Sequence, residues 1–195
     1  MDRRADTDAP DEALLIAFAN GDGGAGQVLI TRLAPRLFGY ATRILGDHAE
    51  AEDVVQETMM KLWKMAPDWR QGEAKVSTWT YRVAVNLCTD RLRRRKVRGH
   101  VALESVTEPE ADLQSAVEHM TEKDRADALQ SALHDLPDRQ RQAVVLRHLE
   151  GLSNPEIAQI MDIGVEAVES LTARGKRALK AALSGRKEEL GYDEA

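Results

Sequence analysis

The chain has 195 residues with 27 basic and 33 acidic side chains, and its net charge of −6 argues against a protein that simply coats nucleic acid. Its 13 Gly and 6 Pro are too few for a loop-rich all-β protein. The longest apolar run, residues 13–19, is too short to cross a bilayer, and the acidic N-terminus is unlike a signal peptide. A single cysteine, Cys88, excludes internal disulfides and a cysteine-based zinc site. We therefore expect a soluble, cytoplasmic, all-α protein without membrane insertion.

Apolar residues recur every three or four positions in the first half of the chain, which predicts a helical domain over residues 11–97. A short first helix ends at residues 20–21, and a second runs over about 27–45, where Pro35 should bend or restart it. A third helix with an acidic outer face follows to about residue 65. Residues 66–76 lack periodicity and are predicted to form a loop.

The fourth predicted helix has a concentrated basic end. Ser77-Thr78 is a candidate N-cap for a helix from Trp79 to about Lys96, and residues 91–98 hold six basic side chains. Four of the eight aromatic residues fall between positions 63 and 81: Trp63, Trp69, Trp79 and Tyr81. Flat rings beside cations suit single-stranded nucleic acid, although the same spacing also fits rings that close a small core.

Residues 98–124 are acidic, contain Pro and lack periodicity, which predicts a flexible linker between two small domains. A second helical domain is predicted over 125–184, with helix breaks at Leu136-Pro137 and Gly151. We expect residues 1–10 to form a disordered acidic N-terminus and residues 185–195 a polar tail.

The most informative local pattern lies in the second domain. Residues 153–156 (SNPE) have the S-x-x-E spacing of a capping box, with Pro in the first turn. A short apolar helix, a tight turn at 162–164 and a longer helix over 165–183 with a basic end follow. This order is typical of a helix-turn-helix, whose second helix enters the DNA major groove. An ordinary helical corner has the same spacing, so the pattern alone leaves both interpretations open.

Two sets of residues resemble a known family. Residues 53–58 (DVVQET), 77–86 (STWTYRVAVN) and 90–95 (DRLRRR) are similar to the second domain of bacterial sigma-70-family initiation factors. Residues 136–137, 139–141, 146–147, 149–153, 156–158 and 167–171 resemble the fourth domain of the small extracytoplasmic-function (ECF) group. The resemblance covers nearly the whole chain except its ends and the linker, and the two motif sets occur in the family's order.

The resemblance implies a non-catalytic specificity subunit that binds the beta and beta-prime subunits of core RNA polymerase. Its second domain would recognise the −10 element and help to melt it, contacting single-stranded DNA, and its fourth domain would read the −35 element as duplex. ECF factors are typically restrained by an anti-sigma factor, so such a partner is expected, in a stress or envelope response. No catalytic residue, cofactor or metal site is expected.

The resemblance also assigns roles to individual residues. Core-polymerase binding falls on Asp53, Gln56 and Glu57, which share one helix face. Contacts to −10 DNA fall on Trp69, Ser77, Trp79, Tyr81, Arg82, Asn86, Arg91, Arg94 and Arg95. Contacts to −35 DNA fall on Glu166, Ala167, Glu169, Ser170, Ala173, Arg174, Lys176 and Arg177. Val168 and Leu171 should face inward, and Thr172 is either a DNA-facing polar residue or a weakened core contact.

Two other classes of function remain alternatives. A helix-turn-helix activator with a sensory N-terminal domain explains the last helix but leaves residues 53–57 and 79–86 without a purpose. An enzyme is disfavoured because the five His are scattered and no Gly-rich phosphate loop or Ser/His/Asp arrangement is present. Metal sensing by Cys88 with His100 is weaker than the interpretation of Cys88 as a small buried hydrophobe.

Overall fold

The computed structural model describes residues 8–70, 72, 74–99 and 117–184, and every secondary-structure element within them is helical, which confirms the all-α expectation. In chain order the elements are α1 (Asp11–Ala19), α2 (Gly23–Leu45), α3 (His48–Met65), η1 (Ala66–Asp68), α4 (Val76–Gly99), α5 (Val117–His134), α6 (Asp138–Val144), η2 (Val145–Leu149, a π-type turn), α7 (Asn154–Met161) and α8 (Val165–Ser184).

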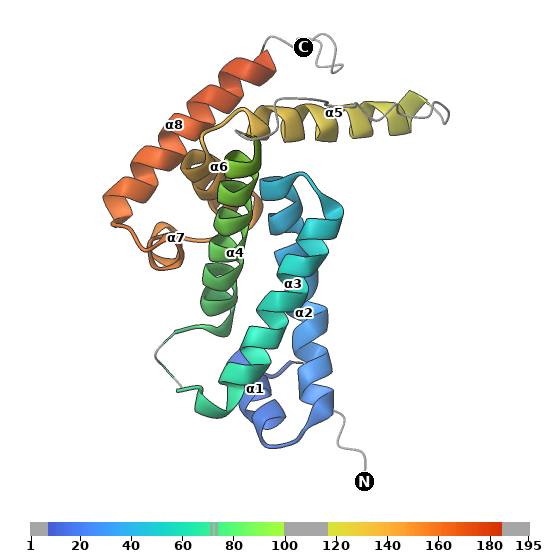
Figure 1. Ribbon diagram of the computed structural model, residues 1–195, viewed down its shortest axis with the longest axis vertical. Helices are drawn as coiled ribbons and strands as arrows, with labels where there is room; N and C mark the ends of the chain where they lie inside the picture. The colour runs from blue at the N-terminus through green and yellow to red at the C-terminus, as the bar shows by residue number, and fades with distance from the viewer. Residues whose placement is uncertain (1–7, 71, 73, 100–116, 185–195) are drawn as a thin grey trace.

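Helices α1–α4 form the N-terminal unit, in which α2, α3 and α4 pack side by side and α1 crosses their far end (Figure 1). Side-chain caps begin the long helices: Asp22 accepts a hydrogen bond from the Ala25 N–H, and Asp47 accepts one from the Glu50 N–H. Gly46, with φ of 68°, ends α2 in the left-handed region. The core of this unit contains the fully buried side chains of Leu29, Leu37, Tyr40, Ile44, Leu62 and Tyr81.

Two helix boundaries in this unit differ from the sequence expectation. Helix α2 begins at Gly23 because Asp22 caps it, and it continues through Pro35 without restarting. Helix α4 begins at Val76 rather than at Trp79, since the Trp79 N–H already donates to the Lys75 carbonyl at 3.1 Å. Ser77 therefore lies inside the first turn and is not the N-cap. The short helix η1 occupies part of the segment that was expected to be a loop.

Helices α5–α8 form the C-terminal unit. Glu156 accepts hydrogen bonds from the Ser153 backbone N–H at 3.0 Å and from the Ser153 hydroxyl at 2.7 Å, which fixes the start of α7. Asp162, with φ of 54°, makes the turn into α8. Gly175 is buried where α8 crosses α6, and a Cβ atom there would lie 2.5 Å from the Val144 Cγ2 atom. Helix α8 thus approaches α6 so closely at this point that any side chain larger than that of glycine would force a neighbour to move.

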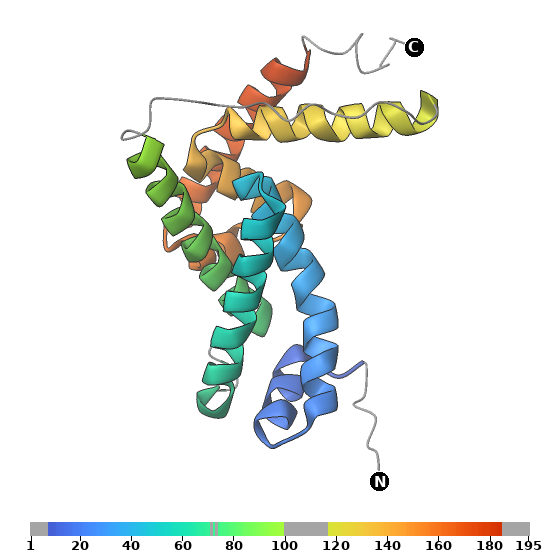
Figure 2. The same ribbon diagram turned by 45° about the vertical axis from the view of Figure 1, so that its right-hand side comes forward.

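The two units lie against each other. Helix α7 packs beside α4, and α5 crosses the end of α2, while the N-terminal part of α5 projects away in both views (Figures 1 and 2). Helix α4 extends to Gly99 and α5 begins at Val117, so both ends of the expected linker 98–124 are helical. Residues 100–116, together with the predicted N-terminal segment 1–7 and the tail 185–195, lie outside the described residues.

Candidate nucleic-acid interface

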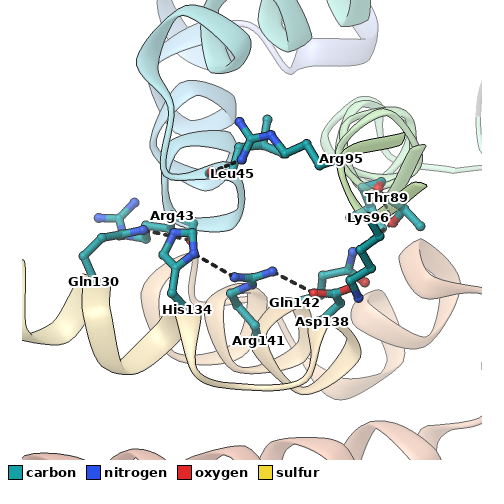
Figure 3. Close-up of polar contacts among 11 residues, drawn as sticks. Arg43, Leu45, Thr89, Arg95, Lys96, Gln130, His134, Asp138, Arg141 and Gln142 are labelled. Atoms are coloured by element: carbon teal, nitrogen blue, oxygen red, sulfur yellow. Dashed lines mark hydrogen bonds and ion pairs between the residues drawn. The ribbon is translucent and has the colours of Figure 1, made fainter. Parts of the chain in front are cut away.

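The basic end of α4 contains side chains in two different environments. Arg82 and Arg94 are exposed, as is the amide of Asn86. Arg95 is half-buried instead: its Nη1 donates to the Leu45 carbonyl at 2.7 Å, and its Nη2 lies 3.0 Å from a Glu50 carboxylate oxygen. Arg95 therefore satisfies a carbonyl at the C-terminal end of α2 and ties α4 to it (Figure 3).

The aromatic residues before and within α4 do not form one surface. Trp69 and Trp79 are half-buried and meet edge to face, with ring centroids 6.4 Å apart, close to Ser77 in sequence. The buried Trp69 Nε1 has no hydrogen-bond partner among the described residues. Trp63 stacks instead against Phe18 in the core at 4.3 Å, as its helical spacing predicts. The candidate aromatic surface is therefore the Trp69–Trp79 pair.

Tyr81 is only 2% exposed and lies at the contact between the two units. Its hydroxyl donates to the Glu150 carboxylate at 2.5 Å, and the Arg36 guanidinium lies 5.9 Å from its ring centroid. Burial and the Glu150 hydrogen bond raise the pKa of Tyr81 well above its ordinary value, so the phenol stays a proton donor. The ring is therefore closed to a DNA base in this structure, and it also packs edge to face against Tyr40 of its own unit.

Asn86 faces the C-terminal unit, a placement that the sequence analysis did not foresee. Together with Thr89, Arg93 and Lys96 it lines a cleft of about 330 Å³, closed on the other side by Asp138, Arg139, Gln142 and Met161. These four positions of α4 are spaced by three and four residues and so share one helix face. That spacing was readable from the sequence, but the partner across the cleft was not.

The acidic face of α3 presents the candidate polymerase-binding residues. Asp53 and Gln56 are exposed, whereas Glu57 is half-buried and lies 3.2 Å from Lys61 and 3.7 Å from Arg91. Met60 follows Gln56 by one turn and is 57% exposed, so it adds an apolar side chain to this polar surface. Met60 is not among the sequence-predicted site residues, although its i, i+4 spacing from Gln56 placed it on the same helix face.

Helix α8 sorts its residues into an exposed and a buried side, as the sequence predicts. All eight candidate −35 residues, from Glu166 to Arg177, are exposed, whereas Val168 is buried and Leu171 is half-buried. The Thr172 hydroxyl donates to the Val168 carbonyl one turn earlier, so it is satisfied within its own helix. The Asn154 amide lies 3.4 Å from the Glu169 carboxylate and joins the two helices of the turn.

Cys88 is buried, and that burial raises the pKa of its thiol to about 12. Among the described residues, no group of three or more His, Cys, Asp or Glu side chains is arranged to hold a metal ion. Within the same part of the chain, no helix combines the length and the apolar character that spanning a bilayer requires.

Comparison with protein families matches both units of the chain. Residues 29–98 match the family model for sigma-70 region 2, and residues 126–179 match the model for sigma-70 region 4. The RNA polymerase sigma-H factor of Pseudomonas aeruginosa is 30% identical, over 91% of this chain and 95% of its own. The ECF RNA polymerase sigma factor SigM of Mycobacterium tuberculosis is 35% identical, over 87% of this chain and 82% of its own.

Two solved structures share the fold of this chain. CnrH, determined with the cytosolic domain of CnrY, aligns with a TM-score of 0.67 and 24% identity over 92% of this chain and 99% of that one. The sigma factor RpoE of Bartonella quintana, determined with the anti-sigma factor NepR, aligns with a TM-score of 0.62 and 24% identity over 80% of this chain and 94% of that one. At this identity the likeness shows the fold.

Proposed function

The chain belongs to the ECF group of the sigma-70 family, and on that premise we propose how its two units divide promoter recognition. The protein is a non-catalytic specificity subunit that binds core RNA polymerase and directs transcription initiation at promoters. The observation that carries this conclusion is the presence of region 2 (29–98) and region 4 (126–179), in that order, in one chain.

For the −35 element, α8 is the reading helix. Its exposed side offers Arg174, which suits guanine, and Glu166 and Glu169, which suit the amino group of cytosine. Lys176 and Arg177 are exposed one turn further along and would hold phosphates, positioning the helix without specifying sequence. Burial of Val168 on the opposite side supports this orientation.

For the −10 element, the Trp69–Trp79 pair and Ser77 are the candidates to hold an extruded base. Flipping a base out of the stack costs a few kcal/mol, and aromatic stacking offsets that cost. Asn86 offers both a donor and an acceptor for a base edge, while Arg82 and Arg94 are exposed on α4 to contact phosphates. Arg91 and Arg95 remain candidates for contacts with −10 DNA, and in this structure they interact with Glu57 and with Leu45 and Glu50, respectively.

For core polymerase, the exposed side of α3 is the candidate surface. Asp53, Gln56 and Glu57 suit a basic partner, assigned by the family resemblance to the beta-prime subunit. Met60 adds an exposed apolar group beside them, which suits the desolvated centre of an interface. The beta subunit of core polymerase is proposed to contact the protein in the same complex.

We further propose, from membership of the ECF group, that an anti-sigma factor restrains this protein as part of a stress or envelope response.

We place the protein in the cytoplasm, where core polymerase and promoter DNA are found. The domain boundaries 11–97 and 125–184 remain our proposal for the folded units.

The test is transcription in a purified system. Core RNA polymerase is given sheared genomic DNA with and without the protein, and the 5′ ends of the RNA are sequenced. We expect new start sites that share spaced −35 and −10 elements. If no start depends on the protein although it binds duplex DNA by itself, the helix-turn-helix activator becomes the better assignment.

A further inference from the structure

The cleft between α4 and the α6–α7 pair has a defined direction along α4. Two contacts join its walls: the Gln142 amide donates to the Thr89 hydroxyl at 2.9 Å, and the Lys96 Nζ lies 2.6 Å from an Asp138 carboxylate oxygen (Figure 3). Asn86 lies one turn before Thr89 on the same helix face and lines the same cleft. The cleft therefore runs along α4 from Asn86 to Lys96, over about 15 Å at the helical rise per residue.

The end of the cleft near Asn86 is apolar around a single amide. Val85, which precedes Asn86, is buried, and so is Met161 at the end of α7. Helix α7 approaches from this end, because Glu156 in its first turn lies 2.9 Å from Lys75, just before α4 begins. The Asn86 amide is exposed and offers both a donor and an acceptor. A nucleobase, with apolar faces and a polar edge, suits this combination.

The opposite end of the cleft carries the positive charge. Arg93 on α4 and Arg139 on α6 are exposed there, and neither has a carboxylate partner among the residues that the structure describes. Asp138 supplies the carboxylate in the lining, but it is already engaged by Lys96 and, at 2.8 Å, by Arg141. The cleft thus has two uncommitted guanidinium groups, one on each wall. Guanidinium groups bind phosphate through paired hydrogen bonds.

We propose that this cleft binds a nucleoside diphosphate, with its base beside Asn86 and its phosphates between Arg93 and Arg139. The cleft volume of about 330 Å³ lies at the lower end of the range for ligand pockets and exceeds what an inorganic anion fills. The seven residues from Asn86 to Arg93 span about 10 Å, comparable with the reach from a base to a terminal phosphate. The contacts that join the walls limit the length of the cleft, which favours a compact ligand over a continuous DNA strand.

This inference goes beyond the proposed function and shares only Asn86 with it. A nucleotide in the cleft covers the amide that is the candidate reader of a −10 base. Nucleotide and −10 DNA would therefore exclude each other at this residue.

The test is isothermal titration calorimetry of the full-length protein with ADP, GDP and inorganic pyrophosphate. About 0.1 M NaCl screens the general attraction of an anion to exposed charges. R93Q and R139Q each remove one cation from one wall of the cleft. The matched controls K64Q and K180Q each remove one exposed cation elsewhere, on α3 and α8. Circular dichroism establishes that all four variants keep the helix content of the wild type.

We expect at least one of the two nucleotides to bind, and we expect R93Q and R139Q each to weaken that binding about 10-fold, because each removes charge-assisted hydrogen bonds to phosphate. K64Q and K180Q should stay within about 2-fold of the wild type. Pyrophosphate should bind about 5-fold more weakly than the nucleotide, because it lacks the contacts at the apolar end.

A further variant tests the orientation of the ligand in the cleft. Asn86→Ala should weaken nucleotide binding about 5-fold and leave pyrophosphate binding within about 2-fold of the wild type. Equal weakening for both ligands would show that Asn86 does not contact the base, and the proposed orientation would be wrong.

Absence of binding of both nucleotides at about 1 mM would overturn the inference. It would also be overturned by equal weakening in K64Q and K180Q, or by an effect in only one arginine variant, since the ligand must contact both walls. Pyrophosphate binding as tight as that of the nucleotide would reduce the cleft to a simple anion site. If only single-stranded DNA responds to R93Q and R139Q, the cleft belongs to DNA instead. Each of these outcomes leaves the transcription test of the proposed function unaffected, because promoter starts can depend on the protein whether or not a nucleotide binds.

Discussion

Helices α4 and α8 are both assigned to DNA, yet they present their candidate residues very differently. On α8 every candidate is exposed, because these residues lie away from the side of the helix that packs against α5, α6 and α7. Helix α4 packs against α2 and α3 on one side and against α7 on another, so Tyr81 is buried and Arg95 is tied to α2. A helix with one packed face leaves all its candidate residues exposed in the free chain, whereas on a helix with two packed faces only some, here Arg82, Asn86 and Arg94, are exposed.

The largest expected effect concerns the packing that holds α8 in place. Gly175→Leu forces a side chain into the position where a Cβ already lies 2.5 Å from Val144, so we expect a loss of about 3 kcal/mol in the free energy of unfolding. Urea denaturation followed by circular dichroism measures it. Ala178→Leu, at an exposed position of the same helix, should change stability by less than about 0.5 kcal/mol. Similar losses in both variants would contradict the close approach.

The next effect tests whether the exposed side of α8 reads bases. Arg174→Ala should weaken binding to a −35 duplex by about 2 kcal/mol and relax its sequence preference at one position. Fluorescence anisotropy with the promoter identified by transcript sequencing, and with single-base variants of it, measures both. Lys176→Ala is the comparison: as a phosphate contact it should weaken binding to all these duplexes alike and reduce the salt dependence. Equal behaviour of the two variants would count against a base-reading role for Arg174.

A smaller effect separates the two kinds of arginine on α4. Arg95→Ala removes hydrogen bonds to the Leu45 carbonyl and to Glu50, so we expect a loss of about 1 kcal/mol in stability. Arg94→Ala should leave stability unchanged within about 0.5 kcal/mol, because Arg94 is exposed. Thermal unfolding of the two variants measures the difference in stability. If Arg94→Ala is the more destabilising, the division of roles on this helix is wrong.

The smallest effect is a pH dependence at the contact between the units. Burial and the charges of Arg141 and Arg95 lower the pKa of His134, while Asp135 acts in the opposite direction. Below pH 6.5 the unfolded state therefore binds more protons at this residue than the folded state, so stability falls as the pH falls from 7 toward the lowered pKa. Melting temperatures between about pH 7.5 and 5.5 measure this change. His134→Gln should flatten the profile in that range, and an unchanged slope would rule out His134 as its source.

Local features were readable from the sequence, and contacts between distant residues were not. The Ser153–Glu156 cap, the turn at Asp162 and the buried side of α8 all follow from patterns within a few residues. Tyr81 shows where such reasoning ends, because its partner Glu150 lies 69 residues away along the chain. Helical periodicity predicts whether a side chain lies on the buried or the exposed face of its helix. It does not predict which distant helix packs against that face. The closeness of Gly175 to Val144 escaped prediction for the same reason.

The burial of Cys88 has a consequence for the signals to which this protein can respond. Peroxides and electrophiles attack thiolates, and a thiol with a pKa near 12 inside the core has almost no thiolate at neutral pH. The chain contains no other cysteine. If its regulon answers to oxidants through a thiol, that thiol belongs to another molecule, and the signal reaches this protein as a change in its binding partner.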